Sequence, residues 1–159
     1  MPESRIRQAF RKRWFGVVAG ATALVISYVM LMQYAYTGRI PRDVEQRVDY
    51  PLYYPERLPE GLAVDEKSYD VTNGVVVYSI SGQGKQVSVT EQRKPKNISQ
   101  EGFYEYSMSN RRNIETPNGL AAIGTVEAVL TSSLVTGQTW VFLRASEGVE
   151  APQLEEITR

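Results

Sequence analysis

The chain has 159 residues, 42% of them hydrophobic and 23% charged, a size that suggests one domain with accessory segments. It has no cysteine, which excludes a disulfide framework, a thiolate metal site and a thiol nucleophile. It has no histidine either, so the usual general base and the commonest metal ligand are missing. The formal net charge of zero hides an asymmetry, because residues 1–14 are basic whereas residues 37–159 carry 13 basic and 17 acidic residues.

The first predicted element is a membrane anchor at residues 15–36, FGVVAGATALVISYVMLMQYAY, which contain no charged residue. A helix of this length spans about 33 Å, enough for a hydrocarbon core of about 30 Å. Trp14, Tyr34 and Tyr36 suit the two headgroup regions. The cations of residues 1–14 predict a cytoplasmic N-terminus and a C-terminal domain outside the cytoplasm. We therefore expect a single-pass protein of the plasma (inner) membrane.

A cleaved signal peptide is the competing interpretation of the same segment. Its apolar region is normally about 7–15 residues long and ends in a small-x-small cleavage site. The present run is longer and ends in bulky residues, which favours an uncleaved anchor.

Small residues at four-residue spacing lie on the predicted helix. Gly16 and Gly20 form a GxxxG pair, and Ala23 continues the spacing from Ala19. Such a face allows close helix–helix contact, so a homodimer through the transmembrane helix is one hypothesis. The alternative is that Gly and Ala are simply common in membrane helices.

Residues 37–60 form a polar stalk followed by a Pro- and Tyr-rich segment that leads into the domain. Pro51, Pro55 and Pro59 exclude a continuous helix or a central strand there. We expect extended chain whose tyrosines (Tyr50, Tyr53 and Tyr54) pack against the domain or the membrane surface; a binding ridge is the alternative.

Residues 61–159 show a series of short strands separated by turn signals. Strands are expected at residues 61–70, 75–81, 86–92, 113–116, 120–124, 125–134 and 139–145. A short helix is expected at residues 100–108, capped by Ser99, and a second at residues 152–157, opened by Pro152. The predicted fold class is α+β: an N-terminal transmembrane helix, then a small antiparallel sheet with one inserted helix and one C-terminal helix.

Two basic clusters flank the predicted helix at residues 100–108, and folding could bring them to one rim. This predicted rim could attract an acidic partner. A solvated loop is the plainer interpretation, and nucleic acid is not an expected partner because the domain is net acidic. The residues of the predicted rim are Arg93, Lys94, Lys96, Tyr104, Tyr106, Arg111 and Arg112.

No catalytic set is visible. A serine nucleophile would need a lysine base because histidine is absent, and the carboxylates show no paired spacing. We therefore expect neither an enzyme nor a bound cofactor or metal.

The domain resembles the DUF4367-type envelope domain over residues 61–159. The resemblance rests on Leu58-Pro59-Glu60-Gly61-Leu62, on Tyr78-Ser79-Ile80, on the strand of residues 87–92, on Thr139-Trp140 and on the terminal helix. Such domains are similar to the curved sheets of bacterial lipoprotein-carrier and sigma-regulator proteins. The resemblance implies an apolar concave face that accepts a lipid or peptide segment, and it implies no catalytic residues. Fourteen residues before the helix are too few for a sigma-binding domain, so sigma-factor sequestration is not expected.

The leading functional hypothesis is a non-catalytic envelope protein whose outer domain binds another envelope protein or an apolar ligand. The runner-up is a structural subunit of a membrane complex, with specificity in the transmembrane helix. An envelope hydrolase is a distant third.

Overall fold

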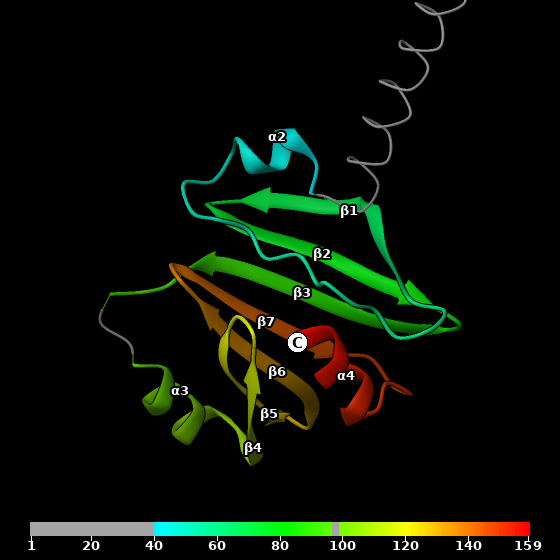
Figure 1. The fold of residues 1–159 in the computed structure, drawn as a ribbon, viewed down its shortest axis with the longest axis vertical. Coiled ribbons are helices and arrows are strands. Elements are labelled where there is room, and N and C mark those ends of the chain that lie inside the picture. The colour runs from blue at the N-terminus through cyan, green and yellow to red at the C-terminus, as the bar shows by residue number, and fades with distance from the viewer. Residues whose placement is uncertain (1–39, 97–98) are drawn as a thin grey trace, which may run out of the picture. The chain divides into compact units, whose positions relative to one another are not determined.

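The computed structural model describes residues 40–96 and 99–159, which belong to one compact unit, residues 40–159. Seven strands form one antiparallel sheet in the order β1-β2-β3-β7-β6-β5-β4 (Figure 1). The strands are β1 (Ala63–Thr72), β2 (Val75–Gly82), β3 (Lys85–Arg93), β4 (Ser109–Thr116), β5 (Gly119–Val126), β6 (Val129–Thr136) and β7 (Thr139–Ala145). The helices are α2 (Arg42–Glu45), α3 (Gln100–Ser107) and α4 (Ala151–Thr158).

The sheet consists of two meanders that meet at one central pairing. β1, β2 and β3 follow one another through tight turns, and β4 to β7 do the same. The chain leaves β3, forms α3, reaches the far edge at β4 and returns so that β7 pairs with β3. The last strand of each meander therefore lies in the middle of the sheet, where both edges of each are hydrogen-bonded.

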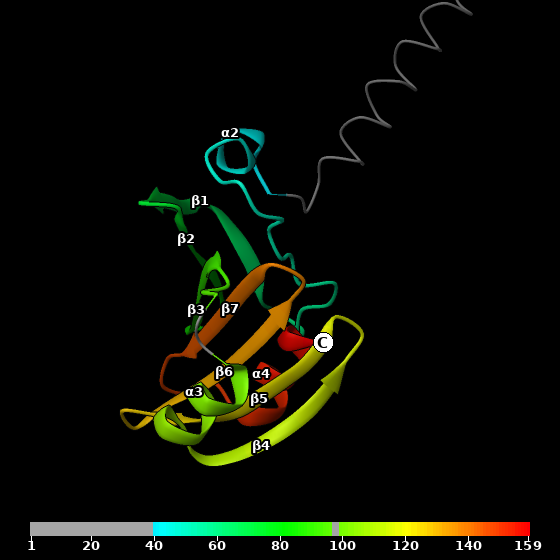
Figure 2. The same cartoon turned by 90° about the vertical axis from the view of Figure 1, so that its left-hand side faces the viewer.

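One face of the sheet carries the main core. Alternate residues of β2, β3 and β7 are buried there, as the period of two requires. The sheet bends around α4 on this face (Figure 2). Leu154 and Ile157 of α4 are completely buried and seal this core.

Residues 49–62, here called the crossing segment, run as irregular chain along the same face (Figure 1). Tyr53 of this segment donates its hydroxyl hydrogen bond to the carbonyl of Ile157 in α4, at 2.6 Å. At the end of the segment, the backbone of Gly61 lies so close to Gly82 that a Cβ at Gly82 would collide with the Gly61 carbonyl. Backbone packing of this kind requires glycine at position 82.

The opposite face carries a smaller aromatic cluster under α3. Phe103 packs edge-on against Trp140 and Phe142, with ring centroids 4.9 and 5.5 Å away. The Trp140 indole donates to the Ser133 hydroxyl at 2.7 Å, so its one polar atom is satisfied in the interior.

The predicted fold class is wrong. The described chain is dominated by a seven-stranded antiparallel sheet, and its helices have only four, eight and eight residues. These helices fill loops and one chain end, so they do not form the second layer that an α+β class implies. Within residues 40–96 and 99–159 no helix is long and apolar enough to cross a membrane. The segment predicted to do so, residues 15–36, lies outside the described residues.

The predicted strand at residues 125–134 is also wrong, because the chain reverses within it. Glu127 and Ala128 form a two-residue turn between β5 and β6, with φ of 48° and 65°. Such a turn favours Asn-Gly, and neither residue is present to signal it.

Candidate functional site

An open basic pocket lies where β3 ends and β6 turns into β7. Its volume is about 380 Å³, and its walls come from residues 93–96 and the Gly137-Gln138 turn. The Lys94 amide donates to the Gln138 carbonyl at 2.7 Å, which fixes the loop against the turn. We call Arg93, Lys94 and Lys96 with this turn the basic pocket.

The cations of the basic pocket differ in whether they form an ion pair. Arg93 pairs with Asp49 at 3.0 Å and also donates to the Asp49 carbonyl at 2.8 Å. The two side chains are 48% and 79% exposed, so this pair contributes at most about 1 kcal/mol and exchanges easily. Lys94 and Lys96 are exposed and form no ion pair with any described residue. The basic pocket therefore presents positive charge that is still available to an anionic group.

The structure does not bring Arg111 and Arg112 to this pocket. Arg112 lies level with Val89 of β3 through the successive pairings with Ile123, Ser132 and Leu143. β4 is the fourth strand from β3, so Arg112 lies roughly 19 Å from Val89 across the sheet, at about 4.8 Å per strand. Arg93 lies four residues further along β3. Arg112 pairs instead with Glu155 of α4 at 2.6 Å. The seven predicted rim residues thus form no single surface.

The two tyrosines of the predicted rim also have different environments. Tyr104 is only 2% exposed; its hydroxyl donates to the Ser133 carbonyl at 2.9 Å and accepts from Gln100 at 2.7 Å. It is therefore part of the aromatic cluster under α3. Tyr106 is 89% exposed. The predicted helix–helix contacts at Gly16, Gly20 and Ala23 lie outside the described residues.

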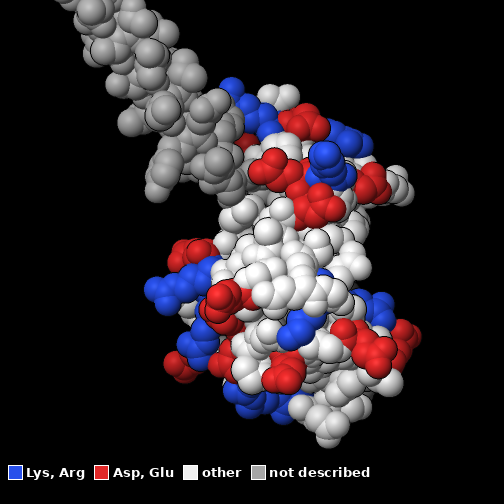
Figure 3. Space-filling model, turned by 90° about the vertical axis from the view of Figure 1, so that its right-hand side faces the viewer, with Lys and Arg blue, Asp and Glu red and all other residues white. Residues whose placement is uncertain are grey.

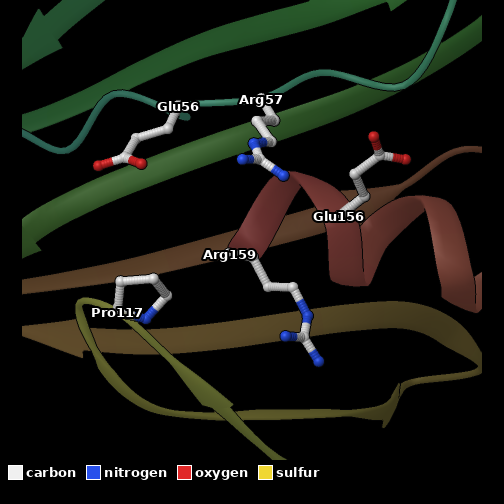
Figure 4. A pocket seen from close by; sticks show the side chains of 5 residues that line it. All are labelled: Glu56, Arg57, Pro117, Glu156 and Arg159. Atoms are coloured by element: carbon white, nitrogen blue, oxygen red, sulfur yellow. The ribbon is translucent and has the colours of Figure 1, made fainter.

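A second pocket, of about 260 Å³, lies between the crossing segment, α4 and the β4–β5 turn. Glu56, Arg57, Pro117, Glu156 and Arg159 line it, so its wall carries both signs of charge (Figure 4). Charges are mixed elsewhere too. On the face at the right of Figure 1, acidic and basic side chains lie above and below an uncharged belt (Figure 3). The basic pocket stands out because its charged residues are all cations.

Beneath the crossing segment lies a carboxyl group that is completely buried, that of Glu91 in β3. Its cross-strand neighbours on the two adjacent strands are both apolar, Val76 and Val141. One oxygen, Oε2, accepts the Tyr53 backbone N–H at 2.7 Å, whereas Oε1 has no hydrogen-bond partner among the described residues. Burial raises the pKa of Glu91 to about 8, although the hydrogen bond from the Tyr53 backbone and the nearby Tyr78 hydroxyl act to lower it.

Tyrosine hydroxyls surround this carboxyl group. Tyr50 donates to the Glu91 carbonyl at 2.9 Å, and Tyr78 donates to the Tyr53 carbonyl at 3.3 Å. Tyr69 stacks on Tyr78 with ring centroids 4.7 Å apart, and its buried hydroxyl has no described partner. Burial, and then the nearby Glu91, raise the pKa of Tyr50, Tyr53 and Tyr78, so these phenols stay neutral at ordinary pH.

A raised carboxyl pKa is also a feature of general acids and bases. Glu91, however, is covered by the crossing segment, so in this conformation it cannot touch a substrate. Nor do the described residues contain a group of three acidic side chains placed to hold a metal ion. The arrangement holds a loop against the sheet rather than presenting a reactive group.

Sequence reasoning did not identify Glu91, although a signal was present. The alternation of the strand expected at residues 86–92 places Val87, Val89 and Glu91 on one face, and all three are buried. The buried position of Glu91 could have been predicted by extending the pattern by one step.

Comparisons of the chain with protein-family models, with curated proteins and with solved structures found no match. The resemblance to the DUF4367-type domain therefore stays a prediction.

Proposed function

We propose that residues 40–159 form a non-catalytic binding domain that recognises an acidic segment of a protein partner at the basic pocket. The observation that carries this proposal is a pair of exposed lysines in the wall of an open pocket, Lys94 and Lys96, which form no ion pair with any residue that the structure describes. Cations placed in this way attract an acidic segment and orient its approach.

The walls of the two pockets described above favour a charged partner over an apolar ligand. Both pockets are lined largely by charged or polar residues. A site for an apolar ligand is expected to be concave and mainly apolar. We therefore place a protein partner first and an apolar ligand second.

The proposal includes a location. The uncharged residues 15–36 and the cations before them support attachment to the plasma (inner) membrane, with the binding domain outside the cytoplasm. Absence of histidine and cysteine from the whole chain, and the covered position of Glu91, support a role without catalysis. An envelope hydrolase is the least supported alternative.

Site-specific photo-crosslinking in native membranes tests the proposal. A photoreactive residue at Gln138, in the wall of the basic pocket, is expected to capture one partner protein. The double variant Lys94→Glu/Lys96→Glu is expected to reduce that capture at least tenfold, because it reverses the charge that attracts the partner.

Lys67→Glu/Arg111→Glu provides the matched control, because it reverses the same number of charges at exposed cations on the two edge strands, β1 and β4. Its effect on capture from Gln138 should be less than twofold. Equal loss in the control and the double variant would show that only net charge matters, and the pocket would be rejected.

The runner-up function is a structural subunit whose specificity lies in residues 15–36. Exchange of this segment distinguishes it from the proposed binding domain. Replacing residues 15–36 by an unrelated membrane segment should leave capture from Gln138 unchanged if the domain binds the partner. Loss of capture, with the protein still in the membrane, would favour the structural subunit.

A further inference from the structure

Residues 49–62 do not join the sheet through a backbone hydrogen-bond ladder, as the strands do. Pro51, Pro55 and Pro59 lack the N–H that a ladder needs. The segment is held instead by hydrogen bonds that involve side chains: Tyr53 N–H to Glu91, Tyr50 to the Glu91 carbonyl, Tyr78 to the Tyr53 carbonyl, and Thr139 to the Pro51 carbonyl. Three further bonds join the segment to the sheet and α4: Tyr50 to the Gly74 carbonyl, Tyr53 to the Ile157 carbonyl, and Arg93 to the Asp49 carbonyl. Of all these bonds, the one from the Tyr53 N–H ends on a carboxyl group that is completely buried, so ionisation of Glu91 acts directly on the attachment of the segment.

Among residues 40–96 and 99–159, no ion pair involves the Glu91 carboxyl group, and no cation is among the groups that shift its pKa. The crossing segment contributes Tyr50 and Tyr53 beside it, β1 contributes Tyr69 and β2 contributes Tyr78. From β7 the residues that pack there, Thr139 and Val141, are uncharged, as are the buried residues of α4. The arginines on the elements around the cluster are engaged elsewhere: Arg93 of β3 pairs with Asp49, and Arg47 donates to the Val71 carbonyl at 2.6 Å. Arg57 of the crossing segment lies in the wall of the second pocket.

The acidic side chains near the cluster add negative charge. Glu56, Glu66 and Asp49 each act on one or more of the surrounding tyrosines and raise their pKa values. An ionised Glu91 would therefore be a buried anion whose Oε1 has no hydrogen-bond partner, and which has no paired cation, in the part of the chain that the structure describes. Exposure of the carboxylate to water is the simplest way to relieve this cost.

We propose that Glu91 is a proton-dependent switch: with its proton it holds residues 49–62 against the sheet, and loss of that proton to solvent releases the segment while the sheet stays folded. The raised pKa of Glu91, about 8, places the switch close to physiological pH. The inference concerns the core face of the sheet and does not depend on the proposed partner at the basic pocket.

Hydrogen exchange of the Tyr53 amide in the full-length chain tests the switch, because this amide donates directly to Glu91. Its protection factor, corrected for the intrinsic rate, is expected to fall about tenfold per pH unit between pH 5 and 8, since opening is coupled to the release of one proton. The amides of β3 and β7 should stay much better protected than Tyr53 at pH 8. Equal protection of Tyr53 and these strands would mean global opening and would overturn the proposal.

Two further measurements test the switch, one with variants and one with the unaltered chain. In Glu91→Gln the protection factor of Tyr53 should change less than twofold over the same pH range, whereas Glu105→Gln, on the exposed side of α3, should keep the wild-type profile. A wild-type profile in Glu91→Gln would overturn the switch. Titration of the Glu91 carboxyl carbon by NMR in the unaltered chain should give a midpoint near pH 8; a midpoint near 4.5 would also overturn it.

Discussion

At the scale of single residues, Glu91 couples the stability of the domain to pH. Its folded-state pKa of about 8 lies above the ordinary value of 4.5. Below pH 4.5 the proton is bound in both the folded and the unfolded states, and the stabilising contribution of this proton is fully present. Between pH 4.5 and 8 only the folded state keeps the proton, so the free energy of unfolding falls by about 1.4 kcal/mol per pH unit.

The variant Glu91→Gln removes this dependence because an amide does not titrate in this range. We expect the free energy of unfolding to be higher than that of the wild type by about 3 kcal/mol at pH 7, and the difference to vanish toward pH 4.5. Urea denaturation at several pH values measures both quantities. Parallel profiles for wild type and variant would contradict the assignment, and Glu105→Gln serves as the surface control.

Residue-scale prediction from sequence was limited by where the partners of each side chain lie. The spacing of residues 93–112 reveals two basic clusters, but three strands lie between the strand of Arg93 and that of Arg112. Similarly, Tyr53 and Glu91 are 38 residues apart, and only the folded chain brings the Tyr53 amide to the carboxylate. Contacts of this range cannot be deduced from local pattern.

At the scale of elements, the turn between β5 and β6 is strained. Ala128 has a φ of 65°, in the left-handed region that costs a residue with a Cβ about 1 kcal/mol or more. Because Gly adopts this conformation freely, Ala128→Gly is expected to stabilise the domain by about 0.5–1 kcal/mol despite the greater freedom of Gly in the unfolded chain.

Chemical denaturation at pH 6 measures this effect. Ala63→Gly, at the start of edge strand β1, is the matched control and should be neutral or destabilising. If both variants shift the denaturation midpoint in the same direction by the same amount, the strain at Ala128 is not relieved by glycine.

Element-scale prediction depended on the turn chemistry. The turns at Asn73-Gly74 and Gly137-Gln138 carry strong signals, and strands are expected on both sides of each. Glu127-Ala128 carries none, so two strands are predicted there as one. Sequence periodicity predicts that a helix forms but does not show how much of a sheet the helix covers. Treating the short helices as a structural layer therefore gives the wrong fold class.

At the scale of the whole molecule, the proposed attachment to a membrane rests on the uncharged residues 15–36. Val25→Arg puts a charge in the middle of residues 15–36 and is expected to weaken membrane retention, because burying a charge in lipid costs about 2.5 kcal/mol or more. Sedimentation of membranes after alkaline carbonate treatment measures retention. Recovery of the unaltered chain in the soluble fraction would contradict membrane attachment.

Recognition of an acidic partner at the basic pocket is proposed to depend on charge. The most direct measurement is the salt dependence of the dissociation constant, Kd, for the protein captured from Gln138. We expect the Kd of the wild type to rise roughly tenfold between 0.05 and 0.3 M salt, and that of Lys94→Ala/Lys96→Ala to rise much less, since salt screens exposed charges. A Kd that does not change with salt, or one that changes equally in both proteins, would contradict the claim.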